Sequence, residues 1–243
     1  MRIHFLPSLI LLATCSGNLA AECRLSPEFI GAEYTITRQT SGQPAETHSF
    51  ALWRAGQRVA HEYPQAHITD VWHLMPNGKI HLVRNFDNAK RGIEYQPVDM
   101  HYEGGKSDWS LKNQLVSDSL LKSLTTVDAS GSGCERQINY RSDKHQQTAV
   151  QLSWLPALQL VKSYREHDGQ TVISWELQNL VSAPTRIDQQ FTRRENYQTT
   201  DFIDIGDNES DPFLQRMIHL GFIEHGASGF YDQAGNPVGQ HAH

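Results

Sequence analysis

The sequence predicts a mainly β protein with a few helices: a curved antiparallel sheet or unclosed β-barrel of about 10–11 strands, with helices packed in its concave side. Three observations support this fold class. Short segments with alternating apolar residues recur along the chain, turn signals such as Asn77-Gly78 and Asp168-Gly169 separate them, and two segments carry apolar residues at helical spacing.

The strand-like segments are rich in β-branched and aromatic residues and are bounded by Gly, Pro, Asn or Asp. In "AEYTITRQ", for example, Tyr34 and Ile36 fall on one face and Thr35 and Thr37 on the other. The predicted strands cover residues 32–39, 47–54, 57–63, 67–75, 79–86, 91–97, 134–142, 148–154, 157–166, 170–180 and 185–194.

The turn at Asn77-Gly78 sets the pairing of the strands on either side. Asn-Gly between alternating apolar runs is a strong hairpin signal, because both turn residues must tolerate a positive φ. As a two-residue turn it places Leu74 opposite His81, so His73 and His81 are expected on opposite faces of the sheet.

Two helical segments interrupt the strands. Residues 107–126 carry leucines at near-helical spacing, with Ser107 or Asp108 as the expected N-cap, and the Gly/Ser run at 129–133 ends the segment. In the tail, Asp211 followed by Pro212 is a typical helix start, and the helix should end near Gly221.

The N-terminus resembles a secretory signal peptide, with Arg2, an apolar run at 5–13 and small residues before an expected cleavage after Ala21. An alternative is a lipoprotein signal with a lipidated Cys15. Cleavage leaves 243 − 21 = 222 residues, expected to form a single β-rich domain over 22–243 with a helical and loop tail at 195–243. The expected location is the periplasm.

Removing Arg2 with the leader leaves 20 Lys and Arg against 27 Asp and Glu, a net charge of −7. This argues against nucleic acid or an anionic membrane surface as a partner. Cys23 and Cys134 are the cysteines left after cleavage, and in an exported chain they are most simply a disulfide; free thiols or a metal pair are the alternative.

Histidines suggest a metal site at first, but the motif fails. His61-Glu62 begins a zinc-protease signature, yet Gln65 stands where the second His belongs and Pro64 would break the helix. The tail acids at 201–211 resemble a calcium loop, but Pro212 replaces the turn Gly, so a solvated loop before a helix is preferred. Histidines from distant strands remain an alternative metal set: His61, His67, His73, His81, His219 and His225.

The sequence contains no nucleophile elbow, no P-loop and no dinucleotide-binding motif. We therefore expect a protein that is not an enzyme and has no cofactor. An exported hydrolase would need two convergent acids, which one sequence cannot place.

The order of the segments resembles the periplasmic lipoprotein-carrier superfamily (LolA/LolB-like). "LWRAGQRVAHEYP", "DVWHLMPNGKIHLVR" and "KRGIEYQP" are similar to its early strands, and "LPALQLVKSYREHDGQTVISWEL" to its later hairpin. The resemblance spans about residues 32–194, leaves the tail from Glu195 unmatched, and includes no invariant motif. It implies an unclosed β-barrel with helices in its mouth, an apolar cavity for acyl chains and no catalytic residues.

Two functional hypotheses follow. The first is an exported, non-catalytic carrier of an apolar small molecule, lipid or lipoprotein, which could act with a membrane-associated partner protein; the second is an exported copper- or zinc-binding protein. An ordinary packed core without a ligand is the competing structural interpretation. The expected cavity residues are Trp72, Leu74, Val83, Ile173, Trp175, Leu214 and Met217, with the tail helix as a lid.

Overall fold

The computed structural model describes residues 22–100, 108–143, 148–208, 210–220, 230–231 and 237–238. The expected leader, its cleavage after Ala21 and the alternative at Cys15 lie outside these residues, as do Ser107, Gly221 and His225. Among the described residues, no helix has the length and apolar character needed to cross a membrane.

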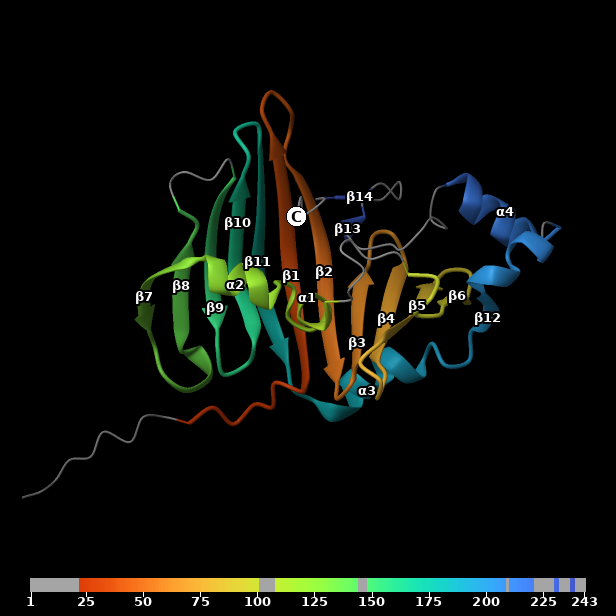
Figure 1. The fold of residues 1–243 in the computed structure, drawn as a ribbon, viewed down its shortest axis with the longest axis horizontal. Helices are drawn as coiled ribbons and strands as arrows, with labels where there is room; N and C mark the ends of the chain where they lie inside the picture. The colour runs from red at the N-terminus through yellow and green to blue at the C-terminus, as the bar shows by residue number, and fades with distance from the viewer. Residues whose placement is uncertain are drawn as a thin grey trace, which may run out of the picture.

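A twelve-stranded sheet dominates the molecule (Figure 1), and its strand order is β12-β6-β5-β4-β3-β2-β1-β11-β10-β9-β8-β7. All neighbouring strands are antiparallel except β12 and β6, which are parallel. The strands are β1 Phe29–Thr40, β2 Glu46–Ala55, β3 Arg58–Tyr63, β4 Ile68–Leu74, β5 Ile80–Phe86, β6 Arg91–Tyr95, β7 Thr125–Ser130, β8 Gln137–Arg141, β9 Ala149–Leu155, β10 Leu160–His167, β11 Thr171–Val181 and β12 Gln198–Asp201. β13 Phe230–Tyr231 and β14 Pro237–Val238 form a separate pair.

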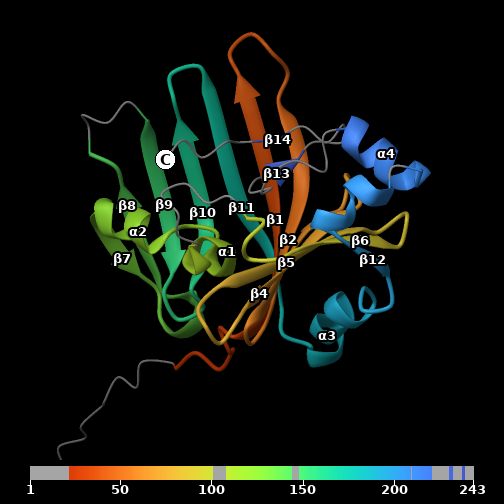
Figure 2. The same cartoon turned by 45° about the vertical axis from the view of Figure 1, so that its right-hand side comes forward.

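The sheet curls without closing, because β12 and β7 stay at opposite ends of the strand order. Figure 2 shows β4 to β6 curving in front of β1 and β11, with α1 Trp109–Gln114 on the inner side. α2 Asp118–Ser123 lies on the same side, and α4 Pro212–His219 lies near β6 and β12 (Figure 1). The mainly β, unclosed-barrel fold class is thus confirmed.

Side-chain alternation explains where the core lies. Most inward positions of the strands are apolar and pack into one inner core, which includes Tyr34, Phe50, Trp72 and Trp175. Outward positions form a smaller outer core around Trp53, which packs against α3 Pro184–Thr192. A sheet that is apolar on both faces needs a cover on each, and helices provide it here.

The hairpin between β4 and β5 corrects the expected register. Leu74 pairs with Ile80, and Met75 N donates to Lys79 O at 2.8 Å, so the loop contains the three residues 76–78 and not two. Gly78 N donates to Met75 O at 2.9 Å, and Gly78 itself has a φ of 76°. The ring of Pro76 fixes its φ at a negative value that suits the first central position of a type I turn, which then needs a left-handed Gly.

This one-residue shift in register reverses the predicted facing of the β5 residues relative to those of β4. His73 pairs directly with His81, so the two side chains share a face, and the expectation that they point apart is wrong. Val83 pairs with Val71 on that same outward face, so Val83 does not face the inner core with Trp72 and Leu74.

Residues 185–194, expected as a strand, form most of helix α3. Pro184 stands at the first turn, where its missing N–H costs nothing. Ile187 and Phe191 lie four residues apart and are both buried against the outer core. Packing of this helical stripe on Trp53 decides the structure of the segment.

The single helix expected at 107–126 is two short helices, and its last two residues begin strand β7. Asp108 caps α1, as predicted, and Leu115 ends it with a φ of 68°. Ser117 then caps α2 through a bond from Leu120 N to its hydroxyl at 3.0 Å. The following strand β7, like the parallel strand β12, has no counterpart in the sequence prediction.

The described residues also include three 3₁₀ turns, η2 Gly133–Glu135, η3 Phe202–Asp204 and η4 Gly206–Asn208. Cys134 in η2 forms the predicted disulfide with Cys23. It ties the start of the described chain to the connection between β7 and β8, at one edge of the sheet.

Candidate functional site

The expected cavity residues mostly meet in the inner core. Trp72, Trp175 and Leu214 are 1–2% exposed and belong to it. Leu74, Ile173 and Met217 are partly buried against the same core. Val83 is the exception, since the register of β4 and β5 points it outward.

Helix α4 starts at Asp211-Pro212, as predicted, and is attached to the sheet at the end of the inner face. Asp211 accepts from Phe213 N at 2.8 Å and also from Arg91 Nη2 at 2.8 Å. The Arg91 bond and the Phe213 N–H hold the pKa of Asp211 below its usual value. The rings of Phe213 and Phe86 meet edge-on, with their centroids 5.3 Å apart. The Cζ atom of Arg91 lies 4.7 Å from the centroid of the Phe213 ring.

A row of polar side chains crosses the apolar inner face. His61 on β3 pairs with Asp70 on β4, and Asp70 pairs with Arg84 on β5, so the three inward positions are adjacent. Arg54 on β2 and Lys112 on α1 lie buried beside them. We call these five residues the inner polar cluster: Arg54, His61, Asp70, Arg84 and Lys112.

Asp70 and Arg84 neutralise each other. Arg84 donates from Nε and Nη2 to the two carboxylate oxygens of Asp70, at 2.8 and 2.7 Å. Both side chains are 1% exposed. Two parallel hydrogen bonds between opposite charges allow both groups to stay buried. Because the two charges are opposite, the pair adds no net charge to the site.

Arg54 is held by backbone carbonyl groups from three segments of the chain. It donates to the carbonyl oxygens of Asn113, Pro27, Leu158 and Gln159 at 2.5–3.0 Å. Burial lowers its pKa to about 10, so it stays protonated at neutral pH. Neutral carbonyls solvate the cation but do not cancel its charge.

His61 connects the sheet to α1. Its Nε2 lies 2.7 Å from the carbonyl oxygen of Lys112, which makes Nε2 the protonated nitrogen. Burial and the nearby Lys112 lower the pKa of His61 to about 4. His61 is therefore neutral at pH 7 and positions α1 without adding charge.

Lys112 is the unusual member of the inner polar cluster. Its side chain points to the sheet, with the ammonium 4.2 Å from the ring centre of Trp72. Among the described residues no carboxylate oxygen lies within 4.0 Å of the ammonium. Burial lowers the pKa of Lys112 to about 8.

Sequence analysis missed this cluster, although a signal was present. Arg54, Asp70 and Arg84 stand at inward positions of β2, β4 and β5. The other inward positions of these strands are mostly occupied by apolar residues. A charge at such a position must find a partner or neutralise. The correct register of β4 and β5 would have placed Asp70 opposite Arg84.

The five described histidines of the alternative metal set do not converge; the sixth, His225, lies outside the described residues. His61 faces inward, whereas His73 and His81 face outward, and His81 Nε2 contacts Glu94 at 2.8 Å. His67 lies in an exposed turn and His219 is exposed at the end of α4. No group of three or more His, Cys, Asp or Glu that could hold a metal occurs in the part of the chain that the structure describes.

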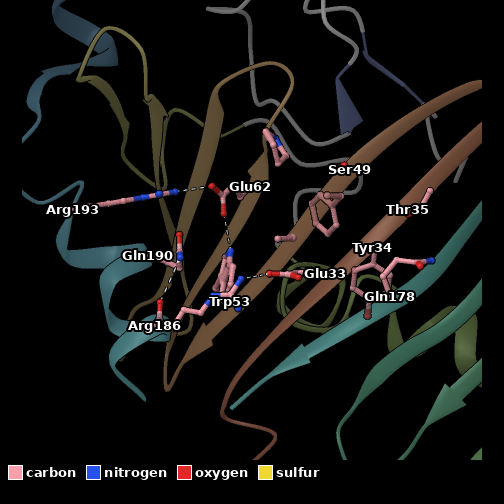
Figure 3. A pocket seen from close by; sticks show the side chains of 13 residues that line it. Glu33, Tyr34, Thr35, Ser49, Trp53, Glu62, Gln178, Arg186, Gln190 and Arg193 are labelled. Carbon is pink, nitrogen blue, oxygen red and sulfur yellow. Dashed lines mark hydrogen bonds and ion pairs between the residues drawn. The ribbon is translucent and has the colours of Figure 1, made fainter. Parts of the chain in front are cut away.

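A polar pocket of about 430 Å³ lies on the outer face, between α3 and strands β1 to β3 (Figure 3). Glu33 pairs with Arg186 and Glu62 pairs with Arg193, both at 2.6 Å. Trp53 Nε1 donates to Glu62 at 2.9 Å. The two acids and the two arginines compensate each other, so these bonds fix α3 to the sheet.

No protein-family model matches the sequence, and no curated protein matches it. Solved structures similar to the chain include members of the superfamily that the sequence resembles. A putative outer membrane lipoprotein-sorting protein domain from Vibrio parahaemolyticus is 7% identical, with a TM-score of 0.32 over 66% of this chain and 89% of that one. A LolA superfamily protein from Nitrosomonas europaea is 7% identical, with a TM-score of 0.23 over 66% and 90%.

The MucA/MucB complex structure from Pseudomonas aeruginosa is also similar, at 15% identity and a TM-score of 0.33. The match covers 66% of this chain and 56% of that one. At these scores and identities the neighbours assign no ligand, partner or activity to this chain.

Proposed function

We propose that this protein is an exported, non-catalytic carrier of an apolar ligand, such as an acyl chain, a lipid or a lipoprotein. The observation that carries the proposal is the inner face of the sheet. It is apolar across most of its width, the sheet does not close around it, and short helices cover it.

The covering helices are suited to exchange with a ligand. α1 and α2 contain six residues each and α4 contains eight. Helices this short have little stability of their own and depend on tertiary contacts. An acyl chain that replaces those contacts gains about 0.8 kcal/mol per buried CH₂ group.

The disulfide supports export, because such bonds persist in oxidising compartments. A carrier of this kind would receive and deliver its ligand at a membrane or through a membrane-associated protein. The lid hypothesis assigns that exchange to α4, which is attached through Asp211, Phe213 and Leu214.

The proposal is tested by titrating a fluorescent fatty acid into the mature chain. Met217→Gln should weaken binding about tenfold or more, because a polar amide would replace an apolar contact of α4 with the inner core. Ile218→Gln is the matched control, since Ile218 on the same helix is 50% exposed. Circular dichroism checks that both variants keep the sheet.

Saturable binding by the wild type that is weakened only by Met217→Gln would support the carrier. Absence of saturable binding by the wild type, or equal binding by all three proteins, would instead favour a packed core without a ligand.

A further inference from the structure

The inner face carries more buried positive than negative charge. Arg54, Arg84 and Lys112 are cationic at neutral pH, while Asp70 is the buried acid among the described residues of this face. Asp70 is already matched by the bidentate bonds of Arg84. Arg54 is bonded to neutral carbonyls, and no described carboxylate oxygen lies within 4.0 Å of the Lys112 ammonium, although Asp70 and, more weakly, Asp108 attract it.

Arg54 uses four of its five N–H donors in hydrogen bonds, whereas the Lys112 ammonium makes no hydrogen bond to a described residue. Arg54 donates to four carbonyl oxygens. Lys112 is 7% exposed, and its ammonium contacts the face of Trp72 at 4.2 Å. A cation–π contact attracts the charge but leaves N–H donors of the ammonium to be satisfied.

Trp72 supplies a second unsatisfied donor in the same place. Its Nε1 is buried and has no hydrogen-bond partner among the described residues. An indole N–H and an ammonium group can each donate hydrogen bonds but cannot accept them. Two donor groups thus lie at one indole ring without an acceptor among the described residues. A ligand group that offers acceptor atoms and a negative charge would complement them.

The candidate ligands differ in how well they meet this demand. A ligand with a cationic head would add to the positive charge, and a purely apolar ligand would leave both donors buried and unpaired, which is costly. A carboxylate or phosphate offers several acceptor oxygens and compensates the ammonium. The lowered pKa of Lys112 agrees with this, because burial outweighs the opposing influence of Asp70.

Building on the proposed carrier function, we propose that Lys112 and Trp72 bind the oxyanion head of an acyl ligand whose chain lies along the apolar inner face. The ligand class is thus an acidic lipid, with either a carboxylate or a phosphate at the head. Arg54 adds long-range positive charge but keeps its own structural bonds.

The test compares four probes with equal chain length: hexadecanoic acid, hexadecyl phosphate, methyl hexadecanoate and hexadecanol. The wild type should bind at least one of the two acidic probes about tenfold to hundredfold more tightly than the neutral probes, as expected for a charge-assisted hydrogen bond. Which acidic probe binds more tightly distinguishes a carboxylate from a phosphate head.

Lys112→Met should remove this preference by lowering the affinity for the acidic probes to about that for the neutral probes. Trp72→Phe keeps the aromatic face and removes the N–H, so it should reduce the preference in part. Lys122→Met is the matched control, because Lys122 is exposed in the last turn of α2. Thermal unfolding of each variant shows that it folds.

The outcomes separate the two proposals. Loss of the acid preference in Lys112→Met alone among the lysine variants supports the oxyanion site. Equal binding of acidic and neutral probes by the wild type overturns the oxyanion site and leaves the carrier intact. If no probe binds saturably, both proposals fail.

Discussion

At the scale of single residues, His61 shows how the inner face responds to pH. The buried imidazole donates to the carbonyl of Lys112 and has a pKa lowered to about 4 by burial and by Lys112. In the unfolded chain the same group would bind its proton near pH 6.5. As the pH falls below that value, the unfolded state therefore takes up a proton before the folded state does.

The stabilising contribution of neutral His61 is thus complete above about pH 6.5 and is lost as the pH falls towards 4. We predict a loss of roughly 3 kcal/mol in the free energy of unfolding across this window from His61. His73 acts in the same direction, because partial burial, His81 and Arg58 lower its pKa too.

Urea unfolding at several pH values between 7 and 4 measures this dependence. His61→Gln keeps an N–H donor for the Lys112 carbonyl but does not titrate, so its unfolding free energy should depend much less on pH. An unchanged pH dependence in His61→Gln would show that His61 is protonated normally in the folded state.

The residue scale also shows where sequence analysis reached its limit. Asn77-Gly78 correctly located a turn, but Pro76 determined its type and hence the register of β4 and β5. A shift of one residue exchanges the two faces of a strand. That is why Trp72 and Leu74 were placed correctly with the inner core, whereas Val83 was not.

At the scale of elements, the disulfide compensates for a weakly held edge of the sheet. All six residues of β7 are exposed, and β7 pairs with β8 alone. The Cys23–Cys134 bond attaches the η2 turn between these strands to the N-terminal segment. A cross-link over a sequence separation of 111 residues restricts the unfolded chain strongly.

Replacing both cysteines by Ser should therefore lower the free energy of unfolding by about 4–5 kcal/mol in the chain-entropy model. Within the folded state, the loss of protection should be greatest in β7 and β8. Hydrogen exchange with peptide resolution measures both effects, with β3 to β5 as the internal reference. Equal loss of protection in all strands would show that the bond does not hold this edge.

Elements whose signal was local were predicted well. Asp211 and Pro212 start α4 as expected, and Asp108 caps α1. The interpretation of residues 185–194 as a strand failed, because a ten-residue segment with few apolar side chains fits either period until its packing partner is known. Trp53, far away in sequence, supplies that partner for α3.

At the scale of the whole molecule, the curl of the sheet follows from its size and patterning. Twelve twisted strands with one continuous apolar face bury that face best by curving around it. Alternation of apolar residues was visible in the sequence for most of the strands, though not for β7 or β12, and it indicated the fold class. The inner polar cluster could not be assembled from the sequence, because it depends on how β2 to β5 pair with one another and on the position of α1.

A carrier whose ligand enters this inner face should be stabilised as a unit by the ligand. Hexadecanoic acid at 100 times its dissociation constant should add about 2.7 kcal/mol if it binds the folded chain alone. For a domain of this length, each kcal/mol raises the melting temperature by about 2–4 °C, so a rise of about 5–10 °C is expected. Differential scanning calorimetry across a series of ligand concentrations measures this rise.

Met217→Gln at the same ligand concentrations should show a smaller rise, because weaker binding lowers the ratio of ligand concentration to dissociation constant. A melting temperature that does not rise with ligand, or rises equally in both proteins, would mean that the fatty acid does not bind at the inner face.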